Sequence, residues 1–495
     1  MVLLAEKKKT LEVIAMENHD NAYYVWKDSG LKQKILIHID AHHDIWFIQK
    51  DSQITIANFI CKALEEDIVK EVYWVVPDET WETKKSRNHV LKHLKIITKR
   101  YPGGPTSIDI RDKEISTTII GKKLRVCTLD NLPYMNEEVL LDIDVDFMVI
   151  PQVSYGSFDT HSNIPWCWPG ELLERLKKKN IFSNLVTVAY SVEGGYTPLK
   201  WKYLGDELAC RLDNNSESSL RGMELIKQAA ILACCGDINT SEKMYQEAKQ
   251  FLKNSPVVNY HLALLYKDNN ELDKARTCYQ EAISKDSSYR TPYNTLAVRY
   301  FEEKNYKMAE KELCSILELD PDDAYAHYGL GFIAFKKRMW GSAEKFLKRS
   351  IELNQNLVDS YRALGDLRTA QKQYEEAISF YEHFLKLSLS GYKSLHAFIL
   401  TCTSENLLTD PEHYSVHAKL ARLYANKGSY TEAINGYRIS IAGGHYSSFI
   451  FSQLAFLYLR IGKFKKAFNE IFQALKTIPS DLIDCLDDLK KKLKL

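Results

Sequence analysis

The chain has 495 residues, a length that favours two or three domains over a single one. Hydrophobic residues make up 45% and charged residues 26% of the sequence, proportions that are typical of a globular protein. Because 66 basic residues are balanced by 65 acidic ones, the net charge is +1, which argues against a nucleic-acid or membrane-surface partner.

The ten cysteines are scattered along the chain and form no CxxC pair. In a chain of this length, that pattern favours reduced thiols over a disulfide framework or a zinc knuckle. The first ten residues carry their lysines after a short apolar run, unlike a signal peptide, and no apolar stretch approaches the length of a membrane span. We therefore expect a cytoplasmic protein that does not enter a membrane.

Short apolar segments rich in β-branched and aromatic residues alternate with amphipathic segments over residues 1–205. The predicted strands are 11–16, 34–39, 71–77, 124–129, 138–147 and 184–190. The amphipathic segments at 54–67 and 170–180 are predicted to be helices. Strands that alternate with helices favour a mainly parallel sheet flanked by helices, and such sheets bind ligands beyond the carboxyl ends of their strands.

Small residues recur every 34 positions beyond a polar segment at 206–222, which is predicted to be a linker. The first series comprises Ala229, Ala263, Ala297, Gly331, Gly365, Ala421 and Ala455. The second series lies twelve positions later and comprises Ser241, Ala275, Ala309, Ala343, Ala377, Ala433 and Ala467. The step from Gly365 to Ala421 is 22 residues longer than the period and indicates an insertion near 386–414.

This 34-residue period with paired small positions closely resembles the tetratricopeptide repeat. The resemblance predicts about seven repeats over 223–481, followed by a lysine-rich capping helix at 482–495. Such repeats form an all-α solenoid with a concave surface, the usual site for a peptide or protein partner. We therefore expect the repeats to recruit a peptide or protein substrate, with most of the tyrosines serving as packing residues.

Acidic and imidazole groups are concentrated at the ends of two predicted strands, in "DAHHD" at 40–44 and "DIDVD" at 142–146. In an extended chain, Asp40, His42 and Asp44 project to one side. Two strand ends that carry several carboxylates cannot face each other without a cation between them. Carboxylate and imidazole ligands without a thiolate favour manganese over zinc, and this many acids suggests two ions.

Other polar residues near these motifs are expected to have different roles. His38 and His43 are expected to point away from the ligands, His38 as a core histidine and His43 as a support outside the ligand set. His89 and His93 lack the glutamate of a metalloprotease motif and are expected on the exposed face of a helix. Asp159 lies in a loop that could cover the site.

The two motifs resemble signatures of the arginase/ureohydrolase superfamily, in which D-A-H-x-D corresponds to residues 40–44 and S-x-D-x-D to residues 142–146. Residues 1–205 resemble the compact ureohydrolase-like domain of peptide arginases, which convert arginine side chains of ribosomal precursor peptides to ornithine. The resemblance implies an arginase-like, three-layer α/β domain that binds two Mn²⁺ ions and hydrolyses a guanidinium group to release urea.

The resemblance also assigns roles to individual residues. The implied metal ligands are His19, Asp40, His42, Asp44, Asp144 and Asp146. Asp40 and Asp144 would bridge the two ions, and the other four would divide between them, with His19 and Asp44 on the first. Asp44 would also accept a hydrogen bond from the attacking water and move its proton. Asp142 stands where arginases carry serine and would support the ligands from outside.

Substrate recognition is implied at two further positions. Glu193, before two glycines, would orient the guanidinium through paired hydrogen bonds. Asn58 is the best match to the arginase Asn-Leu-His segment that helps to bind the amino acid, and Ile60 replaces the histidine of that segment. The replacement favours an arginine within a peptide over free arginine, and it leaves the group that protonates the leaving amine unassigned.

Two other interpretations of the sequence stay open. A related metal-dependent amidohydrolase, such as a deacetylase, would use a similar domain with one zinc ion and fewer aspartates. The alternative from another class is a non-catalytic repeat scaffold with a degenerate metal-binding domain. The complete set of six candidate ligands argues against the scaffold.

Overall fold

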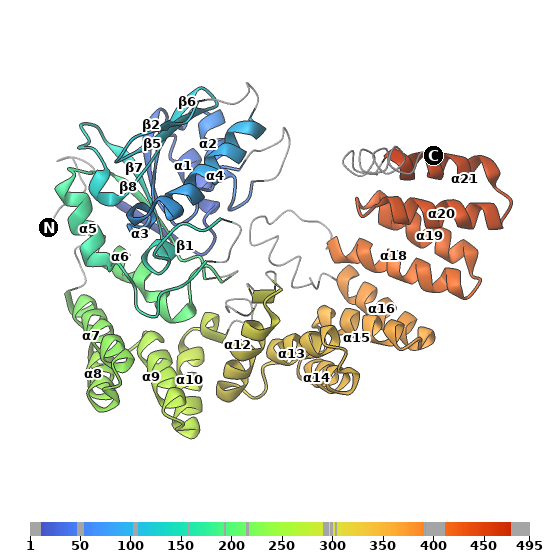
Figure 1. Cartoon of the computed structure of the whole chain (residues 1–495). Helices are drawn as coiled ribbons and strands as arrows, with labels where there is room; N and C mark the ends of the chain where they lie inside the picture. The colour runs from blue at the N-terminus through green and yellow to red at the C-terminus, as the bar shows by residue number, and fades with distance from the viewer. Residues whose placement is uncertain are drawn as a thin grey trace. The chain divides into compact units, whose positions relative to one another are not determined.

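The computed structural model describes residues 11–46, 54–101, 107–155, 159–192, 195–213, 217–290, 304–390 and 411–476, together with residues 297, 300, 301 and 392. The chain divides into one unit over residues 1–322 and a second unit that begins at residue 323. Figure 1 shows the strands within the first unit and repeated helices in both.

An eight-stranded sheet forms the centre of the N-terminal domain (Figure 1). Its order is β1-β8-β7-β2-β3-β6-β5-β4, in which the pairs from β1 to β6 are parallel and the β6-β5-β4 edge is antiparallel. The strands are β1 (Glu12–Met16), β2 (Lys34–Ile39), β3 (Val69–Val75), β4 (Asp109–Ile110), β5 (Ile115–Ile119), β6 (Lys122–Cys127), β7 (Val139–Asp144) and β8 (Leu185–Ala189). All six predicted strands are present, and the mainly parallel sheet is confirmed. The short strands β4 and β5 were not predicted.

Helices cover both faces of this sheet, because alternate residues of its strands are buried on opposite sides. Ile37 of β2 packs in the core beneath α5 and α6, whereas the adjacent Leu36 packs with α1, α2 and α4. The helices are α1 (Asn21–Asp28), α2 (Phe59–Glu65), α3 (Glu79–Glu82), α4 (Lys84–Arg100), α5 (Pro169–Lys178) and α6 (Tyr203–Asp213). The 3₁₀ segments are η1 (Leu129–Asn131), η2 (Val145–Met148) and η3 (Leu199–Trp201). The domain is therefore a three-layer α/β structure.

The predicted linker at 206–222 is wrong at both ends, because helices occupy residues 206–213 and 217–222. Residues 206–213 belong to α6, which lies against β1 and β8. Leu204, Leu208 and Leu212 recur every four residues and are buried in the core of the domain, so this polar segment has an apolar face. The sheet domain therefore continues to Asp213, and the first repeat helix begins at Glu217.

The repeats form helical hairpins in both units. The first unit contains α7 (Glu217–Cys234), α8 (Ile238–Phe251), α9 (Val257–Asp268), α10 (Leu272–Lys285), η4 (Ser287–Arg290) and α12 (Tyr306–Leu319). The second contains α13 (Ala324–Lys336), α14 (Trp340–Leu353), α15 (Val358–Ala370), α16 (Tyr374–Leu389), α18 (Pro411–Asn426), α19 (Tyr430–Ala442), α20 (Ser448–Arg460) and α21 (Phe464–Lys476). The capping helix predicted at 482–495 and most of the insertion lie outside the described residues.

The paired small residues lie where the two helices of a hairpin approach each other, and they are buried. A Cβ atom at Gly365 in α15 would lie 2.5 Å from Cε1 of Tyr381 in α16, so only glycine fits there. A Cβ atom at Gly331 in α13 would lie 2.7 Å from Cγ of Leu347 in α14. None of the described helices combines the length and apolar character needed to cross a membrane.

Candidate metal centre

The candidate site lies at the carboxyl ends of β2 and β7, which are neighbours in the sheet. The chain passes from β2 to β3 on one side and from β7 to β8 on the other, so the strand order reverses between β2 and β7. In open parallel sheets, this reversal leaves a crevice in which ligands bind. Asp40 follows β2 and Asp144 ends β7, while His19 arrives from the segment after β1.

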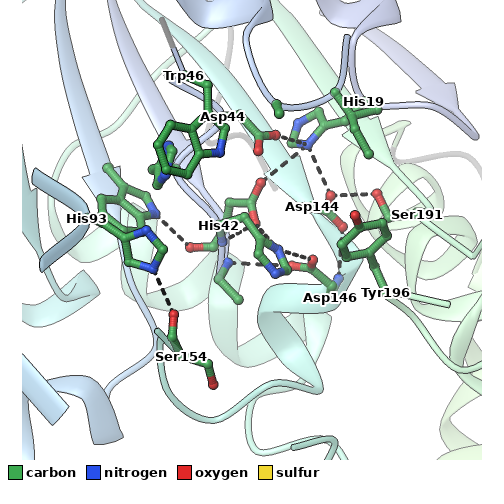
Figure 2. Close-up of a pocket in the computed structure, with 16 residues that line it drawn as sticks. His19, His42, Asp44, Trp46, His93, Asp144, Asp146, Ser154, Ser191 and Tyr196 are labelled. Carbon is green, nitrogen blue, oxygen red and sulfur yellow. Dashed lines mark hydrogen bonds and ion pairs between the residues drawn. The ribbon is translucent and has the colours of Figure 1, made fainter. Parts of the chain in front are cut away.

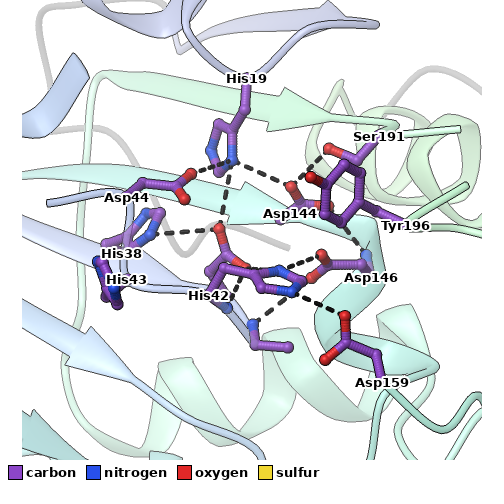
Figure 3. A network of polar contacts seen from close by, with 12 residues as sticks. His19, His38, His42, His43, Asp44, Asp144, Asp146, Asp159, Ser191 and Tyr196 are labelled. Atoms are coloured by element: carbon purple, nitrogen blue, oxygen red, sulfur yellow. Dashed lines mark hydrogen bonds and ion pairs between the residues drawn. The ribbon is translucent and has the colours of Figure 1, made fainter. Parts of the chain in front are cut away.

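His19 is the centre of a first cluster of carboxylates (Figure 3). Its Nδ1 lies 3.0 Å from Oδ2 of Asp144, 3.3 Å from Oδ2 of Asp40 and 3.4 Å from Oδ2 of Asp44. Extended chain ends at Ile39, so strand alternation does not place Asp44 in this cluster. The backbone of Asp44 instead adopts a left-handed conformation with φ of 49°, which is uncommon for a residue other than glycine.

His42 is the centre of a second cluster that shares Asp40 with the first. Its Nδ1 lies 2.8 Å from Oδ2 of Asp146 and 3.4 Å from Oδ1 of Asp40. Its Nε2 lies 3.2 Å from Oδ2 of Asp159 (Figure 3). The loop residue Asp159 therefore reaches the site, and the six predicted ligands lie together in two overlapping groups.

A row of buried polar side chains supports the first cluster from within the sheet. His38, Asp142 and Thr187 are paired across the adjacent strands β2, β7 and β8. His19 Nε2–H and His38 Nδ1–H each donate to Oδ2 of Asp142 at 2.8 Å, and Thr187 donates to Oδ1 at 2.5 Å. Asp142 thus lies behind the imidazoles, on the side away from Asp40.

The prediction that His38 points away from the ligands is wrong. His38 is two residues before Asp40, so strand alternation directs both side chains to the same side. Its Nε2 lies 3.2 Å from Oδ2 of Asp40. His43 does point elsewhere, because its Nδ1 accepts a hydrogen bond from the backbone N–H of Ile45 and its ring lies against Trp46, Trp74 and His93.

Three buried atoms at the centre face one another and have no hydrogen-bond partner among the described residues: His19 Nδ1, His38 Nε2 and Asp40 Oδ2. Leaving such groups unpaired costs about 1–3 kcal/mol each. With metal–ligand bonds of about 2.1 Å, adjacent ligand atoms lie about 3 Å apart, which matches the spacing around Asp40. The donor set, its spacing and its unpaired atoms therefore fit a divalent cation.

The charges of the cluster are balanced by protons when no cation is bound. Although burial opposes a charged ring, Asp142 and the other carboxylates raise the pKa of His19 well above its ordinary value. Burial opposes charge on His38 too, but the neighbouring carboxylates of Asp142 and Asp40 raise its pKa to about 10. Burial favours the neutral acid at Asp40, yet the histidines lower its pKa well below the usual range. A metal ion would displace protons from these imidazoles, as metal binding commonly does.

Aromatic side chains complete a cavity of about 150 Å³ over the two clusters (Figure 2). Trp46 and His93 lie on one side, and Ser191 and Tyr196 lie on the other, while Trp74 is also part of the lining. The prediction that His93 is exposed on a helix is wrong, because its Nε2–H donates to the carbonyl oxygen of Ser154 at 2.7 Å. The contact between His93 and the 153–155 loop joins segments that are far apart in the sequence, so the spacing of residues along the helix does not predict it.

The two predicted substrate-binding residues have different outcomes. Asn58 is not on the wall of the cavity, and its Oδ1 accepts a hydrogen bond from the backbone N–H of Thr55 at 2.8 Å. It shapes the turn before α2, so the structure does not bring it to the site. Glu193 lies outside the described residues, and its role stays a prediction.

The helical part of the chain is similar to known proteins that contain tetratricopeptide repeats. Two models of the tetratricopeptide repeat match residues 257–288 and 360–390, which correspond to the α9–α10 and α15–α16 hairpins. The TPR repeat-containing protein YpiA of Bacillus subtilis (strain 168) is 21% identical over 257 residues, which cover 49% of this chain and 61% of YpiA. The TPR repeat-containing protein MJ1428 of Methanocaldococcus jannaschii is 28% identical over 160 residues, which cover 32% of this chain and 27% of that protein.

The match to each of these relatives thus spans less than two thirds of its length. A solved structure, that of MamA, is 16% identical and has a TM-score of 0.29, covering 40% of this chain and 97% of MamA. Neither repeat match lies in the sheet domain. The chain therefore carries tetratricopeptide repeats C-terminal to a mixed α/β sheet domain.

Proposed function

We propose that the sheet domain is a metal-dependent hydrolase that converts arginine side chains of a peptide or protein to ornithine, and that the repeats recruit this substrate. One observation carries the proposal: six candidate ligands from three separate segments of the chain meet in one cavity at the strand-order reversal. Tetratricopeptide repeats present surfaces that bind peptides or proteins, which suits a substrate larger than a free amino acid.

The two clusters could each hold one cation, and the resemblance to arginases implies that the cations are Mn²⁺. His19, Asp40, Asp44 and Asp144 would hold one ion, and Asp40, His42 and Asp146 would hold the other. When bound, such ions make water nucleophilic at neutral pH and stabilise the negative charge that develops during hydrolysis.

The side chains around the clusters supply the remaining requirements of guanidinium hydrolysis. Carboxylates attract the cationic group, and the flat rings of Trp46 and Tyr196 offer surfaces on which a planar cation and its methylene chain can pack. Asp44, at the margin of the first cluster, would accept the proton of the attacking water. By the resemblance to arginases, Glu193, which lies outside the described residues, would orient the guanidinium through paired hydrogen bonds.

The direct test is incubation of Mn²⁺-loaded protein with arginine-containing peptides, followed by mass spectrometry and a urea assay. We expect a loss of CH₂N₂ per modified arginine and one urea released. Asp144→Asn should abolish this change, whereas Asp130→Asn, at a 76% exposed side chain on η1, should retain it.

Two results would contradict the proposal. The first is the absence of ornithine across a varied peptide library while the protein holds metal. The second is hydrolysis of acetyl-lysine peptides by protein that contains a single zinc ion, which would favour the deacetylase alternative.

A further inference from the structure

A second cavity of about 200 Å³ lies where the first repeats meet the sheet domain, within the first unit of the chain. The segment at η3 forms one wall, and α7, α8 and α9 form the others. Ala230, Ala233, Leu264 and Leu265 make much of the lining apolar. A small apolar recess with a few polar groups is the usual form of a ligand pocket.

The polar groups of this cavity are mainly donors. Lys200 Nζ lies over the ring of Trp201 at 5.0 Å and donates a hydrogen bond to the carbonyl oxygen of Asn163 at 3.2 Å. Within the described part of the chain, no carboxylate forms an ion pair with Lys200. Trp201 is 1% exposed, and its indole N–H has no hydrogen-bond partner there. The one acid of the lining, Asp268, has a carboxylate that is 72% exposed and lies 3.4 Å from Nζ of Lys267.

The repeats hold Lys200 in place through its backbone. His261 of α9 donates its Nε2–H to the carbonyl oxygen of Lys200 at 2.9 Å, which leaves Nδ1 to accept from the hydroxyl of Tyr245 in α8 at 3.3 Å. Partial burial lowers the pKa of Lys200, although the nearby acids Asp268 and Glu312 raise it. An anionic ligand next to the ammonium would favour its charged form further.

Two short segments connect this cavity to the candidate metal centre. Asp159, which contacts His42, is four residues from Asn163 of the second cavity. Tyr196, on the wall of the first cavity, is four residues from Lys200. A span of four residues covers at most about 14 Å, so both segments keep the two cavities close together.

We propose that the second cavity binds an acidic side chain of the same peptide whose arginine enters the metal centre. This assignment rests on the proposed function, since that function supplies the peptide. The ammonium of Lys200 and the indole N–H of Trp201 pair with the carboxylate, and the leucines and alanines contact its methylene groups and an apolar neighbour. The distance between the cavities places the acidic residue about two to six residues from the arginine.

The test measures binding of labelled peptides to the full chain by fluorescence anisotropy. The peptides are acetylated and amidated, and each carries one arginine and one glutamate at separations of about two to eight residues. We expect replacement of the glutamate by glutamine to weaken binding about tenfold at the favoured separation, because a charge-assisted hydrogen bond is lost. Lys200→Met should remove this preference.

Lys202→Met is the matched control, because the amine of Lys202 bonds to Oγ of Ser288, and Lys202 is not part of the cavity lining. It should keep the preference for glutamate. Ala233→Phe, which fills the recess without touching the charge, should reduce the affinity for the glutamate peptides to that for the glutamine peptides. Circular dichroism of each variant checks that the helices are intact.

Three results would overturn the assignment. They are equal affinity for glutamate and glutamine peptides at every separation, a glutamate preference that survives Lys200→Met, and equally tight binding of a glutamine peptide with a free C-terminal carboxylate. Ornithine formation is measured on the same samples. Turnover without a glutamate preference overturns only this assignment, and a Lys200-dependent preference without turnover counts only against the proposed reaction.

Discussion

The side chains buried at the carboxyl ends of the sheet strands differ in kind from those buried at the recurring small positions of the repeats. At the carboxyl ends of β2 and β7, histidines and aspartates are removed from water, and three of their atoms have no hydrogen bond to any residue that the structure describes. At the paired positions of the repeats, alanine, glycine and serine let two helices approach. Buried charges destabilise a fold unless they are compensated, whereas small residues only permit packing. Side chains that could hold a metal ion therefore lie in the sheet domain, whereas the small residues at the repeat positions serve helix packing.

Among substitutions in the two regions, Asp40→Asn is expected to have the strongest effect on metal binding. Asp40 belongs to both clusters, so its loss should weaken Mn²⁺ binding more than about 100-fold, beyond the range for residues that only support ligands. Isothermal titration calorimetry checks the affinity, and circular dichroism should show unchanged helices. Unaltered Mn²⁺ affinity in this variant would contradict the assigned metal centre.

A change of pH should alter the stability of the first unit through His261, which lies where α9 contacts η3 of the sheet domain. Burial lowers the pKa of His261 from its ordinary value of 6.5 to about 4. As the pH falls, His261 is protonated in the unfolded chain at a higher pH than in the folded protein. Its contribution to the free energy of unfolding is therefore complete above pH 6.5 and is lost as the pH falls towards 4. The titration of His261 should contribute a decrease of about 3 kcal/mol to the free energy of unfolding of the first unit over this window.

Chemical denaturation at the two ends of this window measures the decrease. In His261→Gln, the decrease should be smaller by that amount, since the titrating group is gone. An identical pH profile in the variant and the wild type would show that His261 does not remain neutral in the folded protein.

Within the repeats, Gly365→Ala should destabilise the second unit by about 2 kcal/mol. The added methyl group would lie 2.5 Å from the ring of Tyr381 in the facing helix, and overpacking of this kind typically costs about 1–3 kcal/mol. Gly341→Ala in α14 is the control, because its Cβ meets nothing within 4 Å and should stabilise the helix slightly. Thermal denaturation distinguishes the two, and Mn²⁺ affinity should be the same in both.

The smallest effect is expected from Asp159→Asn. This variant removes the negative partner of Nε2 in His42 while leaving the first cluster intact, so only one of the two ions should bind about tenfold more weakly. A titration that resolves two ions would test this. Equal weakening at both ions would show that Asp159 does not act through His42.

Much of the fold and most of the site could be predicted from local patterns. Strand-like apolar segments, the 34-residue period and the two aspartate motifs are visible in single short stretches. The supporting role of Asp142 towards His38 required the pairing of β2 with β7, and the burial of His93 required its contact with the 153–155 loop. The helix at 206–213 was missed because its apolar face is sparse within a polar segment.

The single oxygen of Asp142 that accepts from His19 and His38 fixes the tautomer of both rings. With one nitrogen of each ring committed to donate to Asp142, the other nitrogen is directed towards Asp40 whether it carries a proton or a lone pair. An arriving cation would therefore exchange with protons without requiring either ring to turn. The centre is preorganised by the register of the sheet, so binding of metal would not need to drive folding of the domain.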